Sequence, residues 1–187
     1  MSRDASSTSL SSPVLRRRGL LGLGGAALLG LPGCGFTPMY ARPEGGTAIS
    51  AEMGAIEVAR IPERFGQLQR RALQEKLWSG GQSSPRYTLT VLTVFGVEPE
   101  GFRNDGLPTR IRYTATTSWS LATNEVPPKP LTNGSERTFD AYNLPDNQFF
   151  AGDASRDAMF RRLVDQAADD VVTRLAAYFQ RQATATG

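Results

Sequence analysis

Apolar and polar side chains alternate most regularly in two stretches near the middle of the chain. From Arg110 to Leu121, apolar side chains fall on one face and Arg, Thr and Ser fall on the other. This period of two predicts an antiparallel strand with one face in water. Tyr87 to Val97 also alternates, but its second face includes Leu92 and Val94 and is only half polar. We expect this strand either to be central in a sheet or to meet a partner with that face.

Two further segments have the composition of strands. Ala55 to Ile61 alternates and predicts a first strand. Leu131 to Tyr142 predicts another long strand, which is less apolar and is interrupted by Asn133-Gly134, so we expect a bulge or an edge position. Residues 98–109 are rich in Pro, Gly, Asn and Asp, and they predict a loop between the two central strands.

Two segments have the period of about 3.6 residues that is typical of amphipathic helices. The first begins at Pro62-Glu63 and runs to about Trp78, with Gln69 among the residues of its polar face. The second runs from about Ser155 to Gln180, and Asp153 or Ser155 is its expected N-cap. Its apolar stripe consists of Phe160, Leu163, Val164, Ala167, Val171, Leu175 and Tyr178. We expect this stripe to cover a sheet; the alternative is a surface for a partner or a membrane.

The order β-α-β-β-β-α predicts an α+β two-layer sandwich, with an antiparallel or mixed sheet of about four strands covered by two helices. We expect the helices to cover the face that carries Tyr113, Ala115 and Trp119. Arg110 and Arg112 then lie on the opposite face. This single domain is expected over residues 53–181, followed by a flexible tail at 182–187.

The first part of the chain has the features of a secretory signal. Three arginines at 16–18 precede a short apolar run at 20–31, which is shorter than the roughly 20 residues that a membrane-spanning helix needs. Leu31-Pro32-Gly33-Cys34 resembles the lipobox of bacterial lipoproteins, which implies removal of residues 1–33 and a covalent diacylglycerol and N-acyl lipid on Cys34. The alternative is that Cys34 is discarded with the signal.

The lipobox also suggests where the mature protein resides. Residues 34–52 are expected to be a tether between the lipid and the domain. Gly35 follows the cysteine, and by resemblance to the lipoprotein class this implies the periplasmic side of the outer membrane. Arg17-Arg18 partly fits a twin-arginine signal, so both the Sec and the Tat export routes stay open.

Composition excludes several classes of function. Residues 1–33 contain four arginines and one aspartate, so 17 basic and 17 acidic side chains remain in the mature part. A neutral chain without a basic block argues against nucleic-acid binding. The chain has no histidine and one cysteine, which removes His-based triads, most zinc sites and, with Cys34 acylated, a thiol nucleophile. We therefore interpret it as a non-enzyme; the alternative, a carboxylate-dependent hydrolase, would have to use acids such as Asp140, Asp146 and Asp153.

Several motifs resemble the LptE family of lipopolysaccharide-assembly lipoproteins. They are the opening Cys34-Gly35-Phe36-Thr37-Pro38-Met39-Tyr40, the run from Gln148 to Ala158 and the final helix to Phe179. The resemblance implies a lipoprotein that plugs the outer-membrane β-barrel LptD, assists its assembly and binds lipopolysaccharide on its way to the cell surface, with no cofactor. The alternative is a lipid-anchored binding module of another envelope assembly or secretion complex.

The resemblance also implies that basic residues take part in lipopolysaccharide binding. The candidates are Arg110 and Arg112 on one strand face and Arg103 in the preceding loop, since guanidinium groups bind phosphate in charge-assisted, often bidentate hydrogen bonds. The alternative is ordinary solubilising charge on a wet face. A double change of Arg110 and Arg112 to Glu is predicted to weaken lipopolysaccharide binding without loss of the fold. Phe149-Phe150 is either buried at the entrance of the last helix or in contact with the barrel wall.

Overall fold

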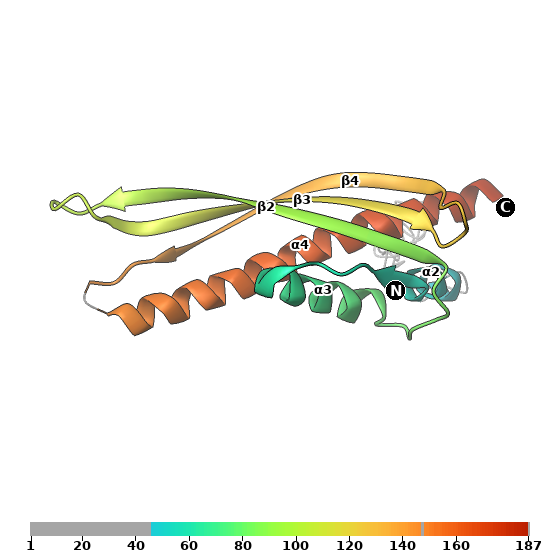
Figure 1. Cartoon of the computed structure of the whole chain (residues 1–187), viewed down its shortest axis with the longest axis horizontal. Helices are drawn as coiled ribbons and strands as arrows, with labels where there is room; N and C mark the ends of the chain where they lie inside the picture. The colour runs from blue at the N-terminus through green and yellow to red at the C-terminus, as the bar shows by residue number, and fades with distance from the viewer. Residues whose placement is uncertain (1–45, 147, 187) are drawn as a thin grey trace, which may run out of the picture. The chain divides into compact units, whose positions relative to one another are not determined.

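The computed structural model describes residues 46–146 and 148–186. The predicted signal peptide, Cys34 and residues 34–45 of the predicted tether lie outside this part. The described elements are α2 (Gly46–Gly54), β1 (Ile56–Val58), α3 (Glu63–Leu77), β2 (Tyr87–Phe102), β3 (Pro108–Thr123), β4 (Pro130–Asn143) and α4 (Phe149–Thr186) (Figure 1).

The four strands form one mixed sheet in the order β1-β2-β3-β4. β1 pairs in parallel with the start of β2, as the intervening helix α3 allows, and the other neighbours are antiparallel. The predicted α+β architecture is therefore confirmed, and β4 occupies the predicted edge position. Asn133 and Gly134, however, pair in regular register with Ser120 and Trp119, and the one register shift recorded between β3 and β4 lies at Leu121/Ala122.

Helices α3 and α4 lie on the same face of the sheet (Figure 1). This is the predicted face, because Ala115 and Trp119 are buried on it while Arg110 and Arg112 are exposed. Helix α4 is 38 residues long and, at about 1.5 Å per residue, spans about 57 Å. The 16-residue strands β2 and β3 span about 53 Å, so one helix runs along nearly their whole length.

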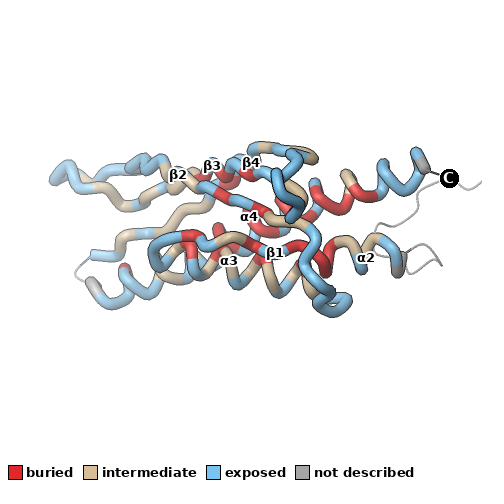
Figure 2. Tube along the Cα trace, turned by 45° about the vertical axis from the view of Figure 1, so that its right-hand side comes forward, coloured by how far each residue is buried: buried red, intermediate tan, exposed pale blue. Residues whose placement is uncertain are grey.

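Buried residues gather where the helices meet the sheet, and the tip of the β2–β3 hairpin is exposed (Figure 2). The predicted stripe of α4 supplies much of the core: Leu163, Val164, Ala167, Val171 and Leu175 are all buried. Its assignment to core packing is confirmed. The packed side chains form a large cluster around Leu73, Leu89 and Trp119 and a smaller one around Ala115, Met159 and Leu163.

One polar side chain of α3, that of Gln69, is buried between this helix and the sheet. Gln69 is fully buried, so its assignment to the polar face of the helix was wrong. Its amide donates to Thr117 Oγ1 at 3.5 Å and accepts from Thr93 Oγ1 at 2.9 Å. The signal was present in the sequence, because Gln69 lies four and eight residues before the buried Leu73 and Leu77, on the same helical face.

The central hairpin is longer than the sequence predicted. Residues 98–109 were expected to form a loop, yet strand pairing continues to Phe102 and Pro108. Pro99 is tolerated because β1 pairs only with residues 87–89, which leaves the far half of β2 at a sheet edge. The turn itself is confined to residues 103–107, where Gly106 adopts φ +81°.

Both ends of the domain also differ from the prediction. α2 is a helix within a segment expected to be a loose tether, and it is attached to the sheet through Glu52, which accepts a 2.7 Å hydrogen bond from the Tyr87 hydroxyl. α4 begins at Phe149 and continues to Thr186, so neither Asp153 nor Ser155 is its N-cap and residues 182–186 are helical. Local sequence signals located this helix but not its ends.

Candidate functional site

One face of the sheet has no described helix over it (Figure 1). Large apolar side chains are exposed there: the exposed fractions are 65% for Leu92, 61% for Val94 and 66% for Phe139. Most exposed apolar residues on a protein are scattered, whereas these three lie on a single sheet face together with three arginines. We call the set formed by Leu92, Val94, Phe139, Arg110, Arg112 and Arg137 the outer-face patch.

Arg110 and Arg112 lie on this face as predicted, and the structure brings them together around one carboxylate. Glu100 on β2 lies 2.5 Å from Arg112 Nη2 and 3.6 Å from Arg110 Nε. Arg110 also donates to the Asn143 amide oxygen at 3.1 Å. Both guanidinium groups are about half exposed, so part of their donor edge faces solvent. Glu98, the cross-strand partner of Arg112, adds a second carboxylate to this face, and Arg137 on β4 adds a third guanidinium.

Sequence reasoning missed the contribution of β4. Arg137 and Phe139 alternate onto the same face, where Thr116 and Thr114 are their cross-strand partners. The Arg112 guanidinium carbon lies 5.9 Å from the centre of the Phe139 ring, in cation–π range. A shallow cavity of about 340 Å³ is lined by Arg112, Arg137 and Phe139 together with Glu98 and Thr114. The sequence could have shown that Arg137 and Phe139 share one strand face, because they are two residues apart. Only the register between β3 and β4 shows that this face lies beside Arg112.

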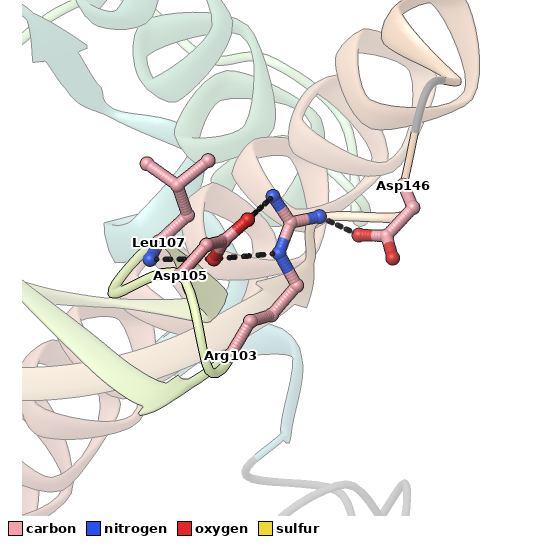
Figure 3. Close-up of polar contacts among 4 residues, drawn as sticks. All are labelled: Arg103, Asp105, Leu107 and Asp146. Atoms are coloured by element: carbon pink, nitrogen blue, oxygen red, sulfur yellow. Dashed lines mark hydrogen bonds and ion pairs between the residues drawn. The ribbon is translucent and has the colours of Figure 1, made fainter.

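Arg103 does not belong to this group. It lies in the turn of the β2–β3 hairpin, where its guanidinium contacts Asp105 and, from the segment before α4, Asp146 (Figure 3). The Leu107 amide and the Arg103 guanidinium hold the pKa of the Asp105 carboxyl below its usual value. With two carboxylates on one guanidinium, Arg103 ties the hairpin turn to the entrance of α4, which makes it a poor candidate for binding an external anion.

The remaining predicted residues are separated from one another. Asp140 pairs with Arg162, Asp146 with Arg103 and Asp153 with Arg156, so these acids do not converge on one cleft. Within the described residues, no group of three His, Cys, Asp or Glu side chains is placed to hold a metal ion. Phe150 is 92% exposed, which excludes burial at the helix entrance for that residue.

The helices of residues 46–146 and 148–186 include none with the length and apolar content needed to cross a membrane.

Comparison with known proteins finds one family model that matches most of the described residues and several solved structures of similar fold. The family model for lipopolysaccharide-assembly LptE matches residues 53–175. A candidate lipoprotein from Caulobacter crescentus CB15 has a similar structure, with a TM-score of 0.56 and 20% identity over 70% of this chain and 95% of that one. Rare lipoprotein B from Shewanella oneidensis is similar with a TM-score of 0.52 and 10% identity over 68% of this chain and 96% of that one. No curated protein sequence matches the chain significantly.

Proposed function

Since this chain belongs to the LptE family of lipopolysaccharide-assembly proteins, we propose that it is the outer-membrane lipoprotein that partners the LptD barrel and contacts lipopolysaccharide in transit. Family membership supports a role in lipopolysaccharide assembly. The finer proposal comprises the lipid on Cys34, the position on the periplasmic side of the outer membrane, the insertion into LptD and the binding of lipopolysaccharide.

The observation that carries the binding proposal is the outer-face patch. Lipopolysaccharide presents phosphates beside acyl chains, and the patch presents the Arg112 guanidinium beside Phe139, with Leu92 and Val94 exposed farther along the same face. Arg110 and Arg112 supply donors of the type that bind phosphate in bidentate fashion. Phe139 supplies apolar area within reach of the same site, because Arg112 lies over its ring. A sheet face with long exposed apolar side chains also suits contact with a partner.

The partnership with LptD is tested by mild-detergent purification of the lipoprotein from outer membranes through a C-terminal tag. A stoichiometric LptD-type barrel, identified by mass spectrometry, supports the proposal. Recovery of a different barrel or secretion complex without LptD contradicts it and favours a role in another envelope machine. The Leu92→Asp/Val94→Asp variant locates the contact, since two charges on this face should reduce barrel recovery if the patch faces the partner.

Lipopolysaccharide binding is tested with Arg110→Gln/Arg112→Gln. Glutamine is preferable to glutamate here, because two further carboxylates beside Glu100 would add repulsion unrelated to the ligand. We expect binding to weaken by about tenfold, the equivalent of roughly 1.4 kcal/mol. Arg71→Gln/Arg181→Gln removes the same charge from exposed helical positions and serves as the control. Equal binding by both variants would rule out the patch as the binding surface.

A further inference from the structure

A second cavity lies on the opposite side of the sheet, at the N-terminal end of α3. It has a volume of about 350 Å³, and its lining comes from α3, α4 and β3. It exists because α3 begins only at Glu63, so that the sheet beyond this point is covered by α4 alone. The volume falls within the range of about 300–1,000 Å³ that is typical of small-molecule sites.

The floor of this cavity is aromatic. Phe65, Tyr113 and Phe160 line it, with the ring centres of Tyr113 and Phe160 5.0 Å apart and those of Phe65 and Phe160 6.0 Å apart, both edge-to-face. Phe95 is not part of the lining but packs edge-to-face on Phe65, with ring centres 4.3 Å apart. Phe95, Tyr113 and Phe160 are only partly buried although they pack on the smaller core cluster. Leu68 completes the apolar lining. Ordered but incompletely buried rings of this kind leave apolar surface available to a ligand.

Arginines surround the mouth of the cavity. Arg64, Arg156 and Arg161 line it, and Asp157 is the only carboxylate among its lining residues. Asp157 lies 3.4 Å from Arg64 and 3.9 Å from Arg161, and Arg156 lies 3.2 Å from Asp153. The rim therefore favours an anion.

We propose that this cavity, termed the aromatic cavity, binds a single-chain anionic lipid, with its headgroup between Arg156 and Arg161 and its acyl chain on the apolar lining formed by Phe65, Leu68, Tyr113 and Phe160. A peptide fits less well. Its main-chain N–H and C=O groups need partners, whereas the walls are a helix pair and a sheet face whose own backbone groups are already paired. The side-chain groups at the rim are guanidinium donors and one carboxylate, while an acyl chain brings no groups that need pairing.

This proposal is independent of the barrel partnership and of the outer-face patch. The two sites lie on opposite faces of the sheet, so a variant of one leaves the residues of the other in place. Failure of the lipid-binding experiment would leave the proposed function standing, and the reverse also holds.

The test uses the full chain with Cys34→Ala, so that no acyl chain of its own competes, and laurate below its micelle concentration as the probe. Calorimetry compares laurate with dodecyl maltoside, which has the same chain and a neutral head, and with inorganic phosphate, which has no chain. We expect saturable laurate binding, at least fivefold weaker dodecyl maltoside binding and no phosphate binding. Equal affinities for laurate and the maltoside would overturn the anionic specificity, and saturable phosphate binding would overturn the need for a chain.

Variants locate the site. Leu68→Trp places an indole in the cavity and should abolish laurate binding, with the melting temperature as the check on folding. Arg156→Gln/Arg161→Gln should weaken laurate at least fivefold and leave dodecyl maltoside unchanged, which keeps the proposal testable if the tryptophan variant does not fold. Arg71→Gln/Arg181→Gln is again the charge-matched control and should bind laurate normally. Laurate binding unaffected by the Arg156→Gln/Arg161→Gln change would overturn the assignment.

Discussion

Gly134 on β4 leaves the space that the indole of Trp119 occupies on β3. The two residues are directly opposite each other in the antiparallel pairing. A Cβ atom on Gly134 would lie 2.6 Å from Cζ2 and 2.8 Å from Cε2 of the indole, closer than nonbonded carbons approach. Trp119 is 5% exposed and belongs to the main core cluster, so the indole has little freedom to move away. Glycine at this edge strand is therefore required by a side chain of the neighbouring strand.

Gly134→Ala is expected to lower the free energy of unfolding by about 1–3 kcal/mol, the usual cost of overpacking a core. Chemical denaturation measures the change. Gly96→Ala is the matched control, because a Cβ there meets only Thr114 Cβ at 3.9 Å, in ordinary contact. A loss at Gly96 as large as that at Gly134 would show that the indole is not the cause. Trp119→Phe combined with Gly134→Ala should recover part of the loss.

Two buried threonines of the sheet, Thr117 and Thr138, should respond differently to replacement by valine. Thr117→Val leaves the buried Gln69 amide without its acceptor and should cost about 1–3 kcal/mol of stability. Thr138 is 2% exposed and its hydroxyl has no hydrogen-bond partner among the described residues. Thr138→Val removes an unpaired polar group at nearly constant volume, so it should be neutral or stabilising. Thermal unfolding of the two variants tests this prediction. A comparable loss of stability in both would contradict it.

Asp170 on α4 predicts a pH-dependent effect on stability. Burial, with the nearby charges of Glu136 and Asp169, raises the pKa of the Asp170 carboxyl. A raised pKa in the folded state means that ionised Asp170 disfavours folding above that pKa and that this penalty disappears as the pH falls. Asp170→Asn should therefore raise the melting temperature at pH 7 by about 1–3 °C and give no gain below about pH 4.

Asp165→Asn is the control for this prediction. Asp165 is 64% exposed and shares Lys76 with Asp169, so its loss leaves the lysine paired. We expect a change of less than about 0.5 kcal/mol at either pH. A gain for Asp170→Asn that persists unchanged at low pH would show that it does not arise from ionisation.

Glu52 links α2 to the rest of the domain, so its substitution should loosen this helix. Its carboxylate accepts a hydrogen bond from Tyr87 and lies 2.8 Å from Arg86, at the start of β2. Glu52→Gln removes the ion pair and should increase amide hydrogen exchange in residues 48–54 about fivefold, with little effect on α4. Glu57→Gln changes an exposed glutamate on β1 and should leave the exchange of α2 unaltered. Unchanged exchange in the Glu52 variant would show that apolar contacts alone hold α2.

The type, order and buried face of the main elements could be read from the sequence because each depends on local periodicity. A period of two in residues 110–121 determines which side chains share a sheet face, and the apolar stripe of α4 determines which side of the helix is buried. Arg110 and Arg112 were placed correctly for this reason. The Leu92 and Val94 side chains likewise indicated a second face that is not fully polar, and both are exposed on the open face.

Tertiary structure alone decided what lies beside these residues. Strand register placed Arg137 and Phe139 next to Arg112, and the contact between the hairpin turn and Asp146 removed Arg103 from the candidate site. The start of α3 was located from the sequence, but only the packing of α3, α4 and β3 around it forms the aromatic cavity. Periodicity specifies one element at a time, whereas these features depend on the pairing and packing between elements distant in sequence. Such contacts depend on complementary shape and charge across the interface, which no single stretch of the chain contains.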